Sequence, residues 1–505
     1  MPPAEQLYAE NIELKLENGQ LRAQINWLKK RLFGGGQSEK LDRTQLILAL
    51  GQLEEADQRA KQLEKVAYER ERNTVKSKKE RDQKAFENLP VSETIIIDPE
   101  EVKASPQDYE KIGEERTEEL DITPPRLIKR VYIRPKYRRR HDRSAPPKVA
   151  PAPARPVAGG YASAGLIAYI IISKYENHLP LRRLERMSGN WGMQIPAQNM
   201  VDWIRMAADW LTPIYNKLKE NLRKSGYIQI DETPVRCNDP DQKRGGTTQS
   251  YLWVMGTPGG DVIFTHKPNR AHEHATTLLG ENYQGLLQSD AYKCYPDYVR
   301  NHPNVIGLGC FAHARRHFYE AQAENPKLNR VALKLISRLY QYERDWDEKG
   351  IPHDHVRAWL RTTHYARPLR WLKTLATKNQ DQVLPQTQTG KAITYLLNQW
   401  ETLTAHTRHG HSRLDNNLIE NAIRPSAVGK KNWLFIGHPE AGQRTAILYS
   451  IVISCRRQGK DPLAYLRDML TRLPKMTNQD DLTPLLPANW HPQQSKSTSG
   501  PIANP

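Results

Sequence analysis

Short apolar strands, set between two long stretches of helical pattern, constrain the fold of this 505-residue chain more than any other feature. In YIQIDETPVRC, residues 227–237, apolar and polar residues alternate, which is typical of a strand with one buried face. The segments YLWVMGT and DVIFTHK are separated by Pro258, Gly259 and Gly260, and this spacing predicts a β-hairpin. A helical pattern, AHEHATTLLG, and two further apolar strands, GLLQSDAY and NVIGLGC, follow. The order predicts a mixed α/β core.

Helical patterns flank and interrupt this core, which we expect to span residues 223–436. The pattern from Ala312 to about His406 predicts a large all-helical insertion at about 318–410. Residues 160–222 are predicted to be helical and to resemble a helix-turn-helix, whose two helices could either read DNA or pack in a core. Its first helix is expected to begin at Leu181. A break at Ser188–Gly192 and a second helix from Pro196 should follow. A C-terminal helical element is expected over 437–490 and a disordered tail over 491–505.

The charge balance is basic, with 75 Lys and Arg against 57 Asp and Glu, a net charge of +18. Such an excess favours a polyanionic partner, most simply nucleic acid, although a soluble protein with a basic surface is the plainer alternative. No apolar run approaches the roughly 20 residues that span a bilayer, and the N-terminus does not resemble a signal peptide. The four cysteines form no CxxC pair, so a cytoplasmic protein without a disulfide framework is expected.

A leucine repeat of seven residues occupies the first 35 residues and predicts a coiled coil that drives oligomerisation. The leucines of this zipper are Leu7, Leu14, Leu21 and Leu28. A single amphipathic helix packed on its own domain is the alternative. The segment before the leucines is acidic, which argues against a basic-zipper DNA reader. A charged helical linker region is expected over residues 36–120.

A cluster of basic residues and tyrosines, PRLIKRVYIRPKYRRRHDR, lies in residues 121–158 before a proline-rich linker. Cations interleaved with aromatic residues suit contacts with DNA phosphates. The alternative is a disordered, solvated linker, which the following SAPPKVAPAPARP also indicates. The residues predicted to contact DNA here are Arg134, Lys136, Arg138, Arg139 and Arg140.

Three carboxylates stand at positions from which they could converge. Asp231 and Asp290 each follow a predicted strand, in YIQIDET and LLQSDAY. Glu420 lies on the polar face of a predicted helix that has Asp415 at its N-cap and that Pro425 should end. Each residue alone is more often solvated, but together they match the oxygen ligands that Mg²⁺ prefers. Two such ions can activate an attacking oxygen and stabilise a leaving one.

Strand parity separates the two adjacent carboxylates of the first strand. It places Asp231 on the same side as Tyr227 and Gln229, opposite the isoleucines. Glu232 would point to the other side if the strand continued, and Pro234 is expected to end the strand soon afterwards. This pattern selects Asp231 as the candidate ligand and leaves Glu232 without a chemical role.

The segments DETPV, LLQSDAY, CFAHARRHF and DNNLIENAIRPSAVGKKNWLFIG resemble those of bacterial transposases of the insertion sequence 66 family. The similarity extends upstream to the leucine zipper and LFGGGQSEK, and downstream to GQRTAILYSIVISCRRQGKDPLAYLRDML and LLPANW. Family members usually carry a cysteine-rich zinc-binding module before the proline-rich linker. Here YIRPKYRRRHDR occupies that position, so no structural zinc is predicted.

The resemblance implies a ribonuclease-H-like catalytic core that carries a DDE triad, with Asp231, Asp290 and Glu420 as both catalytic and metal-binding residues. It implies two Mg²⁺ ions, with Mn²⁺ as a substitute, and DNA as the partner, in the form of terminal inverted repeats and target DNA. A homodimer or higher oligomer and accessory proteins of the element are also expected. Further predicted DNA contacts are Arg315, Arg316, Arg424, Lys430 and Lys431.

Two alternatives to a transposase remain open: a ribonuclease-H-like nuclease without joining activity, and an inactive DNA-binding relic that acts as a regulator. A second metal site is also conceivable in CFAHARRHF, where Cys310, His313 and His317 have helical spacing. Since no fourth ligand lies nearby, a structural or DNA-facing role is the stronger prediction for these three residues.

Overall fold

The computed structural model describes residues 94, 96, 99–108, 125–137, 140, 148–157, 159–239, 246–290 and 292–492. The chain divides into two compact units, Met1–Pro124 and Pro125–Pro505. The described part of the first unit holds helix α4 (Glu100–Ala104) and a 3-10 turn (Pro106–Asp108). The predicted zipper leucines, most of the charged linker region and the tail after residue 492 lie outside the described residues.

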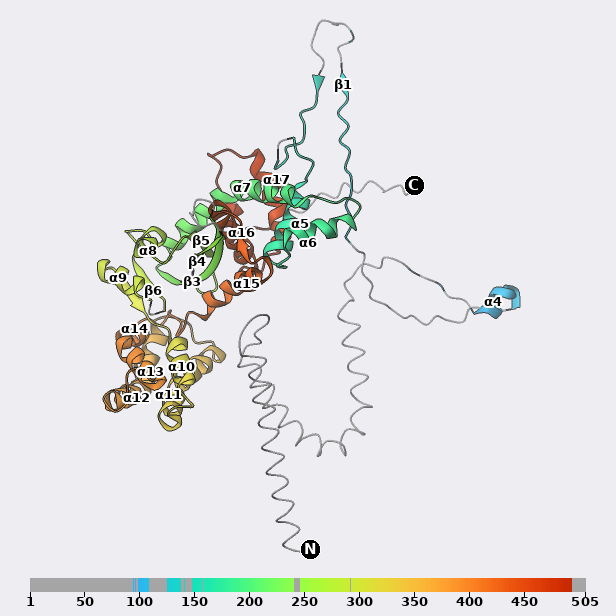
Figure 1. Ribbon diagram of the computed structural model, residues 1–505. Helices are drawn as coiled ribbons and strands as arrows, with labels where there is room; N and C mark the ends of the chain where they lie inside the picture. The colour runs from blue at the N-terminus through green and yellow to red at the C-terminus, as the bar shows by residue number, and fades with distance from the viewer. Residues whose placement is uncertain are drawn as a thin grey trace. The chain divides into compact units, whose positions relative to one another are not determined.

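A mixed six-stranded sheet forms the centre of the second unit (Figure 1). Its order is β5 (Val262–Lys267), β4 (Thr247–Gly256), β3 (Tyr227–Asn238), β6 (Gly285–Gln288), β7 (Val305–Leu308). The first three strands are antiparallel, whereas β6 and β7 run parallel to β3. The short strand β8 (Phe435–Ile436) also pairs with β3, at Arg236 and Cys237. The strands and the hairpin predicted from the sequence are confirmed.

Strand β3 runs four residues beyond Pro234, so the prediction that this proline soon ends the strand was wrong. Proline lacks a backbone N–H and is tolerated where a strand edge needs no donor. On one side β3 pairs with β4 along nearly its whole length. On the other side its partners are β6 at residues 227–229 and β8 at residues 236–237, and Pro234 falls in the gap between them.

Helices cover the sheet on both faces and protect its antiparallel edge. The long helix α16 (Pro439–Arg457) packs along β5 and against α7 (Ala197–Arg223). The Oγ atoms of Ser450 and Ser454 accept hydrogen bonds from the backbone N–H groups of Phe264 and Val262, at 2.8 and 3.0 Å. These serines satisfy donors that an open edge strand would offer to another chain. Helices α5 (Ala164–Tyr175), α17 (Pro462–Arg472), α8 (His272–Leu279) and α9 (Cys294–Asn301) complete the layers.

The predicted helix pair before the sheet is present. Helix α6 (Leu181–Gly189) begins where predicted, and α7 begins at Ala197, with Pro196 at the N-cap. Trp203 of α7 is buried in the main hydrophobic core together with residues of α5, α16 and the sheet. The apolar face of α7 therefore serves the core, as the core-packing alternative required.

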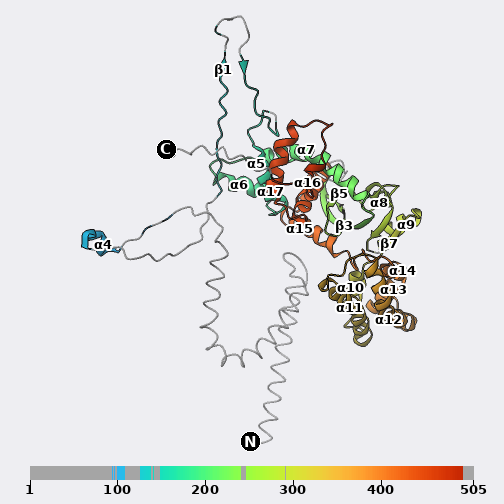
Figure 2. The same ribbon diagram turned by 180° about the vertical axis from the view of Figure 1, so that it is seen from behind.

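Five helices lie between β7 and the helix that carries Glu420, and they have a hydrophobic core of their own. They are α10 (Phe311–Glu320), α11 (Pro326–Glu348), α12 (His355–Asn379), α13 (Gln388–Asn398) and α14 (Trp400–Thr404). Figure 1 and Figure 2 show these helices grouped at one end of the sheet, below β6 and β7. The expected large helical insertion in a mixed α/β core is therefore present.

A short antiparallel ribbon pairs β1 (Lys136–Tyr137) of the basic segment with β2 (Lys148–Val149) of the proline-rich linker. Arg134 donates a hydrogen bond from its guanidinium to the carbonyl of Ala150, at 3.0 Å. The predicted solvated linker is therefore partly paired at residues 148 and 149. Among the residues that the structure describes, no helix is both long and apolar enough to cross a membrane.

Candidate active site

Two aspartates extend from neighbouring parallel strands at equivalent positions. The register pairs Gln229 of β3 with Gln288 of β6. Asp231 lies two residues after Gln229, and Asp290 lies two residues after Gln288. Because adjacent strands are about 4.8 Å apart and side chains alternate with a period of two, both aspartates start from one face of the sheet. Asp290 follows its strand as predicted, whereas Asp231 lies inside β3, because that strand continues to Asn238 in its pairing with β4.

A buried network of glutamines fixes the two strands in this register. The Nε2 of Gln229 donates to Oε1 of Gln288 at 2.8 Å, and the Tyr227 hydroxyl donates to the same oxygen at 2.5 Å. Gln229 also donates to the backbone carbonyl of Asp415 at 2.9 Å, and Gln288 donates to that of Arg413 at 2.9 Å. The network therefore fastens the segment that leads into the next helix directly onto the strands beside Asp231.

The third carboxylate, Glu420, is in the first turn of α15 (Asn417–Trp433), whose N-cap is Asn416. The predicted N-cap, Asp415, lies one residue earlier and accepts from the backbone N–H of Asn417 at 3.1 Å. The prediction that Pro425 ends this helix was wrong, since the helix runs on to Trp433. Its buried face continues past the proline, and that packing outweighs the loss of one backbone hydrogen bond.

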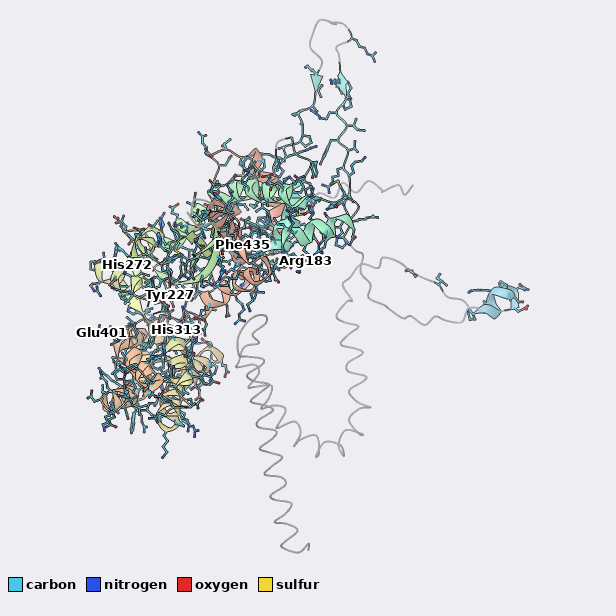
Figure 3. The ribbon with its side chains drawn as sticks, viewed as in Figure 1. Arg183, Tyr227, His272, His313, Glu401 and Phe435 are labelled. Carbon is cyan, nitrogen blue, oxygen red and sulfur yellow. The ribbon has the colours of Figure 1, made fainter. Side chains whose placement is uncertain are left out.

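Glu420 faces two basic side chains of α10. His313 Nε2 lies 3.9 Å from Glu420 Oε1, and Arg316 lies 3.8 Å from Glu420 Oε2. These separations are ion-pair distances and are too long for hydrogen bonds. Figure 3 shows His313 near the junction of the sheet and the insertion helices. Helix α10 therefore places His313 and Arg316 beside Glu420, and the predicted structural or DNA-facing role of CFAHARRHF stays a prediction.

The electrostatics of Asp231 show that the three carboxylates interact. Burial, followed by the charges of Asp290 and Glu420, raises the pKa of Asp231 to about 8. The nearby guanidinium groups of Arg270 and Arg316 oppose this rise. A carboxyl group with so high a pKa is mostly protonated and uncharged at neutral pH, although an ordinary carboxyl group would be ionised. Perturbed groups of this kind concentrate at functional sites.

Two side chains of the site have buried oxygens that a divalent cation could use as ligands. Oε1 of Glu420 and both amide atoms of Asn416 are buried without a hydrogen-bond partner in the described structure. A hard cation would supply the missing positive charge to these carboxylates and use their oxygens as ligands. Across the described ranges no three His, Cys, Asp or Glu side chains are grouped closely enough to hold an ion unaided. Mg²⁺ commonly completes its shell with water and substrate phosphate oxygens, so a set of this kind still suits it.

Glu232, the neighbour of Asp231, has a structural role on the other side of the strand, the side that strand parity predicted for it. Its buried side chain forms an ion pair with Arg270 and accepts a hydrogen bond from the Tyr295 hydroxyl at 2.5 Å. The Arg270 guanidinium also lies over the Tyr292 ring, 3.6 Å from its centroid. Glu232 thus fastens β3 to α9 on the opposite face, and Asp231 is the one of the pair that faces Asp290 and Glu420.

The predicted DNA contacts lie in three places: near Glu420, in the last turn of α15 and in the basic segment. Arg315, Arg316 and Arg424 are exposed close to Glu420, on α10 and on the next turn of α15. Lys430 and Lys431 lie in the last turn of α15, because that helix continues past Pro425. Lys430 Nζ donates to the carbonyl of Pro234 and the hydroxyl of Thr233, at 2.8 and 3.1 Å, and so occupies the gap beside β3. In the basic segment Arg134, Lys136 and Arg140 are exposed, whereas Arg138 and Arg139 are outside the described residues.

The glutamine network was not predicted, although the sequence carried a signal for it. A Gln stands two residues before the Asp in both YIQID and LLQSD. Buried polar side chains need hydrogen-bond partners, so two strands that each bury a Gln at the same position before an Asp can pair as neighbours and let the two Gln side chains bond to one another. The same argument would have paired β3 with β6.

Comparison with known proteins completes the description of the site. The family model described as Transposase IS66 family matches residues 159–444, and that of the IS66 C-terminal element matches residues 450–488. The uncharacterized protein y4jD of Sinorhizobium fredii (strain NBRC 101917 / NGR234) is 30% identical over 504 residues, which cover 94% of this chain and 95% of the relative. The uncharacterized protein y4qI of the same strain is 29% identical over 413 residues, 79% of this chain and 75% of the relative. The first family match includes Asp231, Asp290 and Glu420.

Proposed function

The chain belongs to the IS66 transposase family, and on this basis we propose that it is a DNA transposase that cleaves transposon ends and joins them to target DNA. The observation that carries the proposal is the pKa of Asp231, which burial and then the charges of Asp290 and Glu420 raise to about 8, on a strand whose register starts Asp231 and Asp290 from one face of the sheet. Clustered carboxylates beside exposed arginines suit phosphodiester chemistry.

The strand order supports a ribonuclease-H-like core for this site. Three antiparallel strands precede two parallel ones, which add on the far side of the first strand, β3. The first aspartate lies on that first strand, the second follows the adjacent parallel strand, and the glutamate comes from a helix packed on them. We propose that these three residues are the DDE triad that the sequence resemblance implied.

Asp231, Asp290 and Glu420 would hold Mg²⁺, or Mn²⁺ in its place, and the bound cations would act as Lewis acids on the scissile phosphodiester. The chain itself positions the reaction. The glutamine network holds Asp231 and Asp290 in register, and the Asp415 carbonyl ties the start of α15 to that network. The exposed side chains of Arg315 and Arg424 would bind DNA phosphates and orient the strand.

The protein's partners in this proposal are its own transposon ends, target DNA and a second copy of the chain. Two ends must be held together during transposition, and the predicted zipper at Leu7, Leu14, Leu21 and Leu28 offers a route to a dimer. Accessory proteins of the element and a cytoplasmic, nucleoid-associated location remain part of the proposal.

The test uses purified full-length protein with labelled duplexes that carry the inverted repeats flanking its gene. In Mg²⁺ the wild-type protein should nick the ends, and it should join pre-cleaved ends with free 3′-hydroxyls to a target plasmid. Cleavage without joining would favour the nuclease alternative. Specific binding without either reaction, in Mg²⁺ and in Mn²⁺, would favour the inactive regulator and overturn the proposal.

A further inference from the structure

A row of exposed cationic and polar side chains follows one side of α11 in the helical insertion. The row, which we name the α11 track, lines a hollow of about 320 Å³. Its members are Arg330, Lys334, Ser337, Arg338, Gln341 and Arg344. Their spacing of three and four residues places them on neighbouring turns of one helix face. All six are exposed, so the track is accessible to a partner.

The charge of the α11 track is not neutralised by the protein. From Pro326 to Tyr342 the helix contains no Asp or Glu. In the described structure Arg330, Lys334 and Arg344 have no ion pair, and Arg338 donates to the neighbouring Gln341 at 2.9 Å. Four acidic residues follow at the C-terminal end of the helix, Glu343, Asp345, Asp347 and Glu348, and the first and third of them pair with arginines of α12. Four exposed cations without ion pairs along one helix face are an electrostatic footprint for a polyanion.

The α11 track adjoins the candidate active site. The hydroxyl of Tyr340 donates to Oδ2 of Asp415 at 2.8 Å, and Asp415 stands five residues before Glu420. Tyr340 lies on α11 between Arg338 and Arg344 but on a more buried face, so this bond fastens the helix that carries the track to the start of α15. Arg315 of α10 is close enough to Tyr340 that its charge opposes the rise that burial causes in the pKa of the tyrosine. The exposed cations of α10 and the track therefore belong to helices that meet at the start of α15.

We propose that the α11 track binds the phosphate backbone of the DNA that leaves the active site, and so sets the path of the transposon end over the helical insertion. This inference rests on the proposed function. Arg330, Lys334 and Arg338 repeat every four residues, about 6 Å along the helix axis. From residue 330 to residue 344 the track spans about 21 Å, which matches the rise of roughly six base pairs along a duplex axis at 3.4 Å each. Ser337 and Gln341 add hydrogen bonds to phosphate oxygens without reading sequence.

The test compares two variants of the full chain that lose the same charge. The first carries Arg330→Gln, Lys334→Gln, Arg338→Gln and Arg344→Gln. The matched control carries Arg367→Gln, Arg370→Gln, Lys373→Gln and Lys378→Gln, four exposed cations of α12. Binding to end-containing duplex is measured without divalent metal, over a range of salt concentrations, after thermal unfolding has shown that each variant is folded.

The track variant should bind roughly 10- to 100-fold more weakly at 0.1 M salt, and its slope of log K against log salt should fall by about 2 to 3. The α12 control should stay within about threefold of wild type. Equal losses in both variants, or wild-type binding by the track variant, would overturn the proposal. Wild-type protein that binds but neither cleaves nor joins would instead count against the proposed function.

Cross-linking provides a readout that does not depend on the fourfold variant. The cysteines at 237, 294, 310 and 455 are buried, so Gln341→Cys would add an exposed thiol for a photo-activated cross-linker. It should cross-link to end DNA at one defined distance from the cleavage position, and Thr374→Cys on α12 should not. Cross-links from residue 374 but none from residue 341 would contradict the proposed path.

Discussion

Replacing Asp231 with Asn tests the crowding of carboxylates directly. In the metal-free protein Asp231 has a pKa of about 8 against an ordinary value of 3.8, because it is buried beside Asp290 and Glu420. The folded state therefore binds a proton that the unfolded state has lost, and stability should fall as the pH rises from about 4 to about 8. At 1.36 kcal/mol per pH unit the upper limit of this cost is about 5 kcal/mol at pH 7.5. Relaxation and water penetration make about 2 kcal/mol the expected value.

Asp231→Asn should therefore stabilise the protein in EDTA at pH 7.5 and raise its Tm by roughly 3–5 °C. Thermal unfolding followed by circular dichroism at pH 5 to 9 would measure this change. The wild-type Tm should decline toward pH 8 more steeply than that of the variant. Asp202→Asn, which removes an exposed carboxylate on α7, is the matched control and should change neither value. A variant with a lower Tm than wild type, or with the same pH dependence, would refute the crowding argument.

Three further predictions concern the metal, the insertion and α15. The apparent Mg²⁺ affinity, measured by calorimetry, should rise about tenfold per pH unit from pH 6 to 8 and then level off, because the metal displaces the Asp231 proton. Arg361→Gln should lower the free energy of unfolding by about 3–5 kcal/mol in denaturant titrations. The reason is that the buried guanidinium pairs with Glu343 at 2.8 Å and donates hydrogen bonds to the 406–412 segment. The exposed control Arg367→Gln should cost under about 0.5 kcal/mol. Lys430→Gln should cost about 1 kcal/mol through its lost bonds to β3, whereas Lys431→Gln should weaken only DNA binding.

The strands and helices that surround the site could be predicted because each carries a strong local pattern. The alternation in YIQIDET and the Pro-Gly-Gly turn were sufficient to predict β3 and the hairpin. The ends of elements were harder to predict. Pro234 and Pro425 each have a local preference to stop an element, but the first lies beside an unpaired edge and the second on a helix whose buried face continues. Tertiary packing decided both outcomes.

The candidate carboxylates could be selected from strand ends and helix phase, whereas their partners could not. The spacing of His313 indicated a structural or DNA-facing role but not its partner, because contact with Glu420 depends on how the insertion helices return to the sheet. The Arg361–Glu343 pair joins residues on two helices of the insertion, and no local pattern indicates that an arginine in α12 is buried. Contacts between elements far apart in the chain are set by topology, which a single sequence specifies only weakly.

The most direct test of the account is the rate of end cleavage by Asp231→Asn, Asp290→Asn and Glu420→Gln in Mg²⁺, each compared with wild type and with the surface control Glu440→Gln. The account predicts that each of the three loses cleavage by more than about a thousandfold while it still binds end DNA, and that Glu440→Gln cleaves like wild type. Wild-type cleavage by any one of the three would contradict the claim that they form a single catalytic site.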